Sequence, residues 1–340
     1  MNAGYESGGY GMIDLDGTLT ERSRMAGTTA QEIQANADLL LQSHPHSAEA
    51  AIVFSPLVPL LGGFDEENSR NAMHRSVAGY HRMFFEHNLP LDVPSSRELA
   101  PDNLQNYKLI LLPYPLMMTH DEAKALENYV SKGGHLFVEA RPGWVDEQGH
   151  AETVVPGFGW HEMLGVRETS IEPAKEIAVK WGPEEFDGTG FQERFGVLNP
   201  SARVVAAFAD GTPAAYQCAY GNGDAILLGT FAGQRNDSNP QTDHPLAGIL
   251  ARWAGLSTPP VKAPKLVEFR QLDAARGQFI FLFNHGKQPA RVEFNAKLPQ
   301  EARGIREIVT AQVLTADGRR FHVETEIPSE SVRVYRIDFK

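Results

Sequence analysis

A strand–helix–strand pattern in the middle of the chain restricts its possible folds more than any other feature. Residues 109–112 (LILL) form a short apolar run, as expected of a strand buried on both faces. Thr119 and Glu122 have the spacing of a helical capping box, and the glycines at 133–134 would end that helix. Residues 136–138 then have the pattern of the next strand. Two buried strands joined by an amphipathic helix predict a parallel sheet with a right-handed crossover.

The surrounding sequence extends this pattern into a larger domain. Residues 50–54 (AAIVF) predict another buried strand, and residues 67–88 carry one apolar stripe at helical spacing. Residues 214–220 and 225–231 flank a Gly-Asn-Gly-Asp turn, which predicts a hairpin. We therefore expect a three-layer α/β domain with a mainly parallel sheet over residues 48–258.

The two ends of the chain differ from this middle part. Residues 262–340 alternate in short strands, which predict a small all-β sandwich. The proline-rich residues 257–264 interrupt both helix and strand, and they mark the linker before it. Residues 1–47 form a Gly-rich N-terminal arm with one helical stretch. The expected division is thus into residues 1–47, 48–258 and 262–340.

Composition excludes several classes of partner and fold. Lys and Arg number 31 against 43 Asp and Glu, a net charge of −12, so we expect neither nucleic acid nor a membrane surface as a partner. The longest nearly apolar run, residues 109–118, contains two prolines and is too short to span a bilayer. Cys218 is the single cysteine, which excludes an intramolecular disulfide. The first residues lack the regions of a signal peptide, and a cytoplasmic location is expected.

Residues 14–20 (DLDGTLT) form the sharpest short motif. They resemble the first motif of haloacid-dehalogenase-type phosphatases, in which Asp14 would attack phosphorus, Asp16 would act as general acid, and Mg²⁺ would neutralise charge. That chemistry requires a buried strand before the first Asp, and here a Gly-rich stretch precedes it. No later Gly-Asp with a second acidic partner has the required spacing. The alternative interpretation is a turn that precedes the next helix.

The sequence context of the other candidate reactive groups favours structural roles for them. Cys218 lies inside an expected strand rather than at a nucleophile elbow, so a buried, inert thiol is the favoured interpretation. His74 and His81 are seven residues apart on one expected helix, a separation of about 10 Å that is too large for one metal ion. The sequence therefore predicts no metal site and no cofactor, and it assigns no catalytic residue.

Three residues are candidates for binding a ligand. Glu139, Arg141 and Trp144 follow the expected strand at residues 136–138. The carboxyl ends of parallel strands border the crevice in which open α/β sheets bind ligands. These side chains are therefore our candidates for lining a pocket, and a structural ion pair with loop packing is the alternative.

Six stretches, taken in order, resemble the C-terminal portion of glycoside hydrolase family 42, the microbial β-galactosidases. They are residues 10–22, 107–113, 129–136, 141–149, 164–166 and 220–225. The resemblance covers nearly the whole chain. It implies that the middle domain is an amidotransferase-like (flavodoxin-like) α/β domain that mediates trimerisation and lacks an amidotransferase nucleophile. It also implies a small C-terminal β-domain, and it makes the phosphatase-like motif at residues 14–20 part of the exit from a catalytic barrel.

The resemblance implies a function without catalysis. Members of this family hydrolyse β-galactosides with two glutamates of a (β/α)₈ barrel, a fold that takes about 250 residues. Residues 1–47 cannot hold such a barrel, so neither glutamate is assigned and enzyme activity is uncertain. We expect the chain to be an oligomerisation or accessory portion of a β-galactosidase-like hydrolase. It would associate with itself, with a trimer as the first expectation, and with a barrel-containing hydrolase subunit. The alternatives are a small-molecule or sugar-binding module that uses the sheet crevice, and a phosphatase that uses Asp14 and Asp16.

Two leucine-rich stretches are expected to anchor the oligomer. Residues 39–41 (LLL) close the helix of the arm, and Leu57, Val58, Leu60 and Leu61 follow the first strand of the middle domain. Contiguous exposed apolar patches on proteins usually mark contacts. The alternative is that both stretches fold back onto the α/β core.

Overall fold

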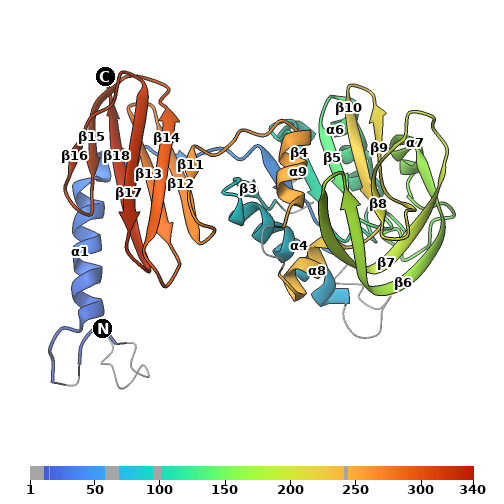
Figure 1. The fold of residues 1–340 in the computed structure, drawn as a ribbon, viewed down its shortest axis with the longest axis horizontal. Helices are drawn as coiled ribbons and strands as arrows, with labels where there is room; N and C mark the ends of the chain where they lie inside the picture. Colours follow the sequence, from blue (N-terminus) through green and yellow to red (C-terminus); the bar gives the residue numbers. More distant parts are fainter. Residues whose placement is uncertain (1–10, 15, 58–68, 95–100, 241–243) are drawn as a thin grey trace. The chain divides into compact units, whose positions relative to one another are not determined.

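The computed structural model describes residues 11–14, 16–57, 69–94, 101–240 and 244–340 (Figure 1). The chain forms two compact units. Unit 1 combines Met1–His46 with Pro260–Lys340, and unit 2 is Ser47–Pro259. The N-terminal arm thus belongs to the same unit as the C-terminal strands.

Within the described residues, unit 2 contains a nine-stranded sheet in the order β3-β2-β4-β5-β10-β9-β8-β6-β7. Its strands are β2 (Ala50–Ile52), β3 (Leu91–Asp92), β4 (Leu109–Leu112), β5 (His135–Val138), β6 (Val166–Trp181), β7 (Glu184–Val197), β8 (Arg203–Phe208), β9 (Pro213–Tyr220) and β10 (Gly223–Leu228). Strands β3, β2, β4, β5 and β10 pair in parallel. The remaining pairs are antiparallel, including the predicted hairpin of β9 and β10, which is confirmed.

The expectation of an amidotransferase-like, flavodoxin-like domain with a mainly parallel sheet is therefore wrong. Four of the eight strand pairings in the sheet are antiparallel, and β6 and β7 are its longest members. The expectation rested on continuous apolar runs, and these two strands have none. Of the 16 residues of β6, only Val166, Ile177 and Val179 are buried. Half of the residues of β6 are exposed and most of those of β7 are only half-buried, so neither strand has the continuous apolar run by which a buried strand is recognised.

Helices cover both faces of this sheet (Figure 1). They are α4 (Ser69–Glu86), α5 (Pro101–Leu104), α6 (His120–Ser131), α7 (Trp160–Leu164), α8 (Ala232–Ser238) and α9 (Leu246–Trp253). Tyr80 of α4 and Leu250 of α9 belong to one core cluster, while Leu126 of α6 and Trp160 of α7 belong to another. The predicted capping box of α6 is confirmed, with the Glu122 amide donating to the Thr119 hydroxyl oxygen at 3.0 Å.

Unit 1 is built from two antiparallel sheets within the described residues. The six-stranded sheet has the order β1-β12-β13-β18-β15-β16, and the three-stranded sheet has the order β11-β14-β17. The strands are β1 (His44–Pro45), β11 (Val261–Lys262), β12 (Val267–Ala274), β13 (Gly277–Asn284), β14 (Ala290–Lys297), β15 (Ala302–Glu307), β16 (Val313–Leu314), β17 (Arg320–Ile327) and β18 (Ser331–Phe339). Side chains from both sheets, among them Phe294 and Tyr335, form one core.

The N-terminal arm packs on these sheets. It contains α1 (Glu21–Ala35) and α2 (Ala37–Leu40), and its strand β1 pairs with β12. Leu39 is 3% exposed and clusters with Phe279 and Ile308, whereas Leu41 is 87% exposed. The expectation that residues 39–41 are an exposed patch is therefore wrong for Leu39, which is buried in unit 1 and not in the α/β core.

Only one residue of the second expected patch lies within the described part of the chain. Of its four residues, Leu57 is half-buried and packs against a core cluster of unit 2. The other three, Val58, Leu60 and Leu61, lie outside the described residues.

Candidate functional site

Glu139, the first candidate residue, follows β5 and is fully buried. Its carboxylate accepts hydrogen bonds from the Tyr80 hydroxyl at 2.8 Å and from the backbone amides of Tyr114 and Gly233, each at 3.0 Å. These donors come from α4, from the loop after β4, and from the first turn of α8. The carboxylate therefore joins three elements around the carboxyl end of the parallel strands.

Burial raises the pKa of Glu139 to about 7, although the hydrogen bonds from Gly233, Tyr80 and Tyr114 oppose the rise. A carboxyl group with this pKa could exchange a proton near neutral pH.

Arg141 and Trp144 form a separate arrangement. Arg141 has a φ of 56°, and its guanidinium carbon lies 4.0 Å from the centroid of the Trp144 ring. Its Nε donates to Glu168 at 3.1 Å, and its backbone amide donates to Glu193 at 3.1 Å. The structure thus brings Arg141 and Trp144 together but gives Glu139 a different set of partners.

Two carboxylates that contact Arg141, those of Glu168 and Glu193, were not among the residues predicted from the sequence. Glu193 of β7 is fully buried, and burial together with the adjacent Glu168 carboxylate raises its pKa well above the ordinary value. A signal was available in the sequence, because Phe191, Glu193 and Phe195 alternate along one face of a strand. A ligand-binding role for Glu139, Arg141 and Trp144 stays a prediction.

The other candidate groups lie elsewhere. Asp16 sits in an exposed turn, where the amide and hydroxyl of Thr18 donate to its carboxylate at 2.9 and 2.7 Å and lower its pKa. Cys218 is buried in β9 opposite Ala225, and burial raises the pKa of its thiol. Across the part of the chain that the structure describes, no three His, Cys, Asp or Glu residues cluster in a way that could hold a metal ion.

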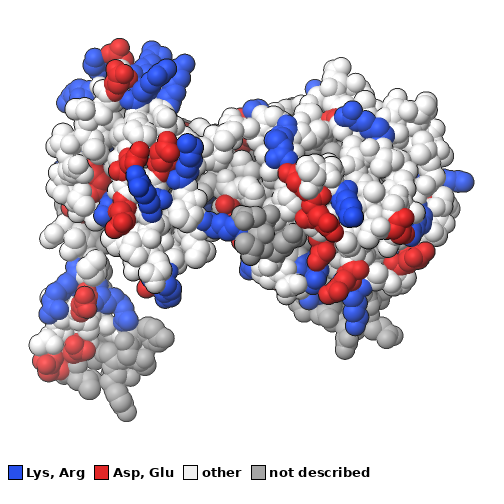
Figure 2. Space-filling model, in the orientation of Figure 1, with Lys and Arg blue, Asp and Glu red and all other residues white. Residues whose placement is uncertain are grey.

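Charged side chains of both signs are mixed on the surface of the molecule. Figure 2 shows Lys and Arg interspersed with Asp and Glu over the face in view, rather than gathered into one basic patch. No helix in the described ranges has both the length and the apolar character needed to cross a membrane.

Comparison with known proteins identifies the middle of the chain. Residues 48–257 match the family model described as the β-galactosidase trimerisation domain. β-Galactosidase LacA of Lactobacillus acidophilus is 27% identical over 163 residues, which are 46% of this chain and 23% of that protein. β-Galactosidase GanA of Bacillus subtilis is 24% identical over 252 residues, which are 72% of this chain and 34% of that protein. The chain thus spans about a quarter to a third of the length of these relatives.

Solved structures extend the likeness to both units. A β-galactosidase from Bacillus circulans sp. alkalophilus matches with a TM-score of 0.76 at 18% identity, over 97% of this chain and 47% of that chain. The cold-adapted β-galactosidase from Rahnella sp. R3 matches with a TM-score of 0.72 at 19% identity, over 96% of this chain and 46% of that chain. At these identities the matches establish the fold. The chain belongs to the β-galactosidases of glycoside hydrolase family 42, corresponds to their C-terminal portion, and contains their trimerisation domain in residues 48–257.

Proposed function

We infer that three copies of the chain associate through residues 48–257, and that the chain serves as the oligomerisation portion of a β-galactosidase. The match of these residues to the trimerisation-domain model is the observation that carries this proposal. The comparisons give no support to the phosphatase or to the sugar-binding module.

The exposed apolar side chains of unit 2 provide a candidate contact surface. Val197, Leu198 and Val204 are 53%, 49% and 51% exposed. All three fall within residues 197–204, at the end of β7 and the start of β8. Contiguous exposed apolar side chains commonly mark an interface between copies, and these three are close together in the sequence. We expect the copies to meet there.

Light scattering behind size exclusion tests this proposal. The expected mass is three times 37.5 kDa. Val204→Lys should lower the mass towards 37.5 kDa, because it places a charge in the proposed contact. Val313→Lys is the matched control, because Val313 is an exposed apolar residue of unit 1. A mass that stays at 37.5 kDa up to high micromolar protein would refute the trimer.

The activity of the whole assembly is part of the proposal. The relatives are named β-galactosidases, and the chain spans less than half of their length. We therefore assign hydrolysis of a β-galactoside to the assembly and not to this portion, with a barrel-containing hydrolase subunit as the expected partner. A cytoplasmic location stays a prediction.

A further inference from the structure

We propose that Glu168 of β6 and Glu193 of β7 share a single proton, and that this carboxyl pair is a pH-sensitive switch at the base of the β6–β7 hairpin. While the proton is present, the two strands stay paired where they lead into residues 197–204. Loss of the proton at alkaline pH opens this end of the hairpin. The expected effect on assembly rests on the proposed function, because residues 197–204 are the contact surface proposed above.

The two carboxyl groups are neighbours on one face of the hairpin. Glu168 lies opposite Phe195, and Glu193 comes two residues before Phe195 in β7. Side chains in such diagonal positions of an antiparallel pair are within reach of each other. The side chains of Glu168 and Glu193 are in hydrogen-bond contact. The register of the two strands shifts between Glu168 and Ser170, so the pair lies where the regular ladder is interrupted.

The hydrogen bonds of Glu193 indicate that the pair holds a proton. Its Oε1 accepts a hydrogen bond from the backbone amide of Arg141 at 3.1 Å. Its Oε2 is buried, and no group in the described part of the chain donates to it. Two ionised carboxylates offer only acceptors, so their contact is a hydrogen bond only when one of them carries a proton. A proton held between Glu193 and Glu168 therefore removes the unpaired acceptor, which would otherwise be costly to bury.

One positive charge faces the pair. The Nε of Arg141 donates to Glu168 at 3.1 Å, and Arg141 and Glu168 are the described charged groups that act on Glu193. Arg194, the next residue of β7, pairs instead with Asp210 at 2.7 Å. With the proton, two carboxyl groups and one guanidinium make a neutral site. Without the proton one negative charge is left over beside a fully buried carboxylate, and burial of an uncompensated charge is strongly unfavourable.

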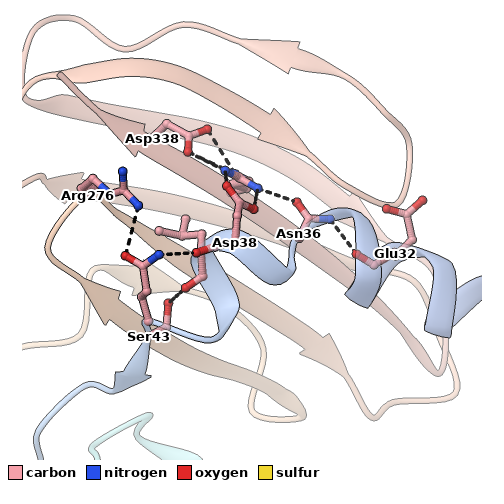
Figure 3. A network of polar contacts seen from close by, with 9 residues as sticks. Glu32, Asn36, Asp38, Ser43, Arg276 and Asp338 are labelled. Atoms are coloured by element: carbon pink, nitrogen blue, oxygen red, sulfur yellow. Dashed lines mark hydrogen bonds and ion pairs between the residues drawn. The ribbon is translucent and has the colours of Figure 1, made fainter.

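A site with the same groups in unit 1 has a different environment. Arg336 donates to Asp38 at 2.8 Å and to Asp338 at 2.9 Å (Figure 3). The two aspartate side chains are 65% and 40% exposed, so water solvates their excess charge. The hydrogen bond from Arg336 lowers the pKa of Asp38. Full burial of Glu193, which is bonded through a backbone amide, is therefore what makes the pair at Arg141 retain a proton.

The carboxyl pair lies next to the proposed contact surface. Beyond Glu193, β7 ends at Val197, whose partner in β6 is Val166. The backbone amide of Leu198 then donates to the carbonyl of Gly165 at 2.9 Å. Repulsion between β6 and β7 at the pair thus acts a few residues from the side chains through which the copies are proposed to meet.

The direction of the switch follows from the burial of Glu193. Burial, together with the adjacent Glu168 carboxyl group, raises the pKa of Glu193 well above its ordinary value. The folded chain therefore keeps a proton that the unfolded chain releases, and the stability of the hairpin base falls as the pH rises. The hairpin is closed at low pH and opens at high pH.

Hydrogen exchange followed by mass spectrometry tests the switch. Peptides from β6 and β7 are compared between the unaltered chain and its variants at about pH 5 and at about pH 9, always at equal pH, so that intrinsic exchange rates cancel. In Glu193→Gln the new amide can accept from Arg141 and donate to Glu168, as the protonated acid does. Glu168→Gln is a second variant that removes the repulsion at a side chain that is 15% exposed. Glu172→Gln is the matched control, because it makes the same change in β6 at a side chain that is 64% exposed.

We expect the hairpin peptides of the unaltered chain and of Glu172→Gln to exchange at least tenfold faster at about pH 9 than those of Glu193→Gln or Glu168→Gln. At about pH 5 the unaltered chain and Glu193→Gln should exchange alike. Protection at the higher pH in either of the two pair variants supports the switch. Protection in neither overturns it.

Light scattering at the same two pH values tests the effect on assembly. The mass of the unaltered chain should fall towards 37.5 kDa at the higher pH, whereas Glu193→Gln should keep the mass of a trimer. A trimer whose mass is the same at both pH values overturns the link between the carboxyl pair and the contact surface and leaves the trimer standing. A chain that is monomeric at both pH values refutes the trimer, and the exchange experiment still decides the switch.

Discussion

Glu139 shows how one side chain can be recognised in the sequence and still have an unexpected environment. Its place after a buried strand predicted a position at the carboxyl edge of the sheet, and the structure places it there. The sequence did not indicate that Tyr80 and Gly233, far away along the chain, both donate to its carboxylate. Burial of the carboxyl group raises its pKa to about 7, although the hydrogen bonds from these two donors oppose the rise.

The raised pKa of Glu139 predicts a pH dependence of stability. Between about pH 4.5 and 7 the folded chain retains a proton that the unfolded chain releases, so the free energy of unfolding should fall as pH rises through this window. Glu139→Gln should remove this part of the slope. It should also lower stability by about 1–3 kcal/mol, because the amide nitrogen cannot accept the hydrogen bonds that the carboxylate accepts.

Urea unfolding at several pH values, followed by tryptophan fluorescence, measures this effect. All four tryptophans lie in unit 2, so the signal reports the unit that contains Glu139. The raised pKa of Glu193 contributes a slope of the same sign to both proteins, and the difference between them isolates Glu139. Identical slopes in the two proteins would contradict the assignment.

Single elements differ in how well their sequences predict them. Helix α6 has its capping box, apolar stripe and terminal glycines within 16 residues, and its start and end match the prediction. Strands β6 and β7 form the long antiparallel hairpin that the sequence did not reveal. Few residues of either strand are fully buried, so neither has the continuous apolar run that marks β4 and β5.

Leu39 and Leu41 are two residues apart and have opposite environments, the first buried and the second exposed. Leu39→Ala should destabilise unit 1 by about 3 kcal/mol, because it leaves a cavity beside Phe279 and Ile308. Leu41→Ala is the matched control and should change stability by less than about 0.5 kcal/mol, because Leu41 is 87% exposed.

Circular dichroism follows both units, whereas tryptophan fluorescence follows only unit 2. The Leu39→Ala variant should therefore shift a transition seen by circular dichroism and leave the fluorescence transition in place. Equal effects of the two alanine variants would show that α2 does not pack on the sheet as described.

At the scale of the whole molecule, the purified chain should not hydrolyse a nitrophenyl β-galactoside above the rate of a mock purification. The reason is that it spans 47% of a solved β-galactosidase and its matched family model is the trimerisation domain. Turnover that copurifies with the chain through several columns would contradict this expectation.

The local features and the family of this protein can be inferred from its amino-acid sequence. Short apolar runs identified β2, β4 and β5, and the order of the motifs indicated the C-terminal portion of a β-galactosidase. These signals are local because burial on both faces of a strand, or a cap at a helix end, leaves its mark within a few residues.

The way in which these elements combine is visible only in the folded chain. The fold made the sheet half antiparallel, placed the N-terminal arm on the C-terminal strands, and gave Leu39 and Leu41 opposite environments. The alternate phenylalanines of β13 are visible in the sequence, but only the fold shows that residues of α1 and β18 line the same groove. Each of these outcomes depends on contacts between residues far apart along the chain, and such contacts leave no periodic pattern in a single sequence.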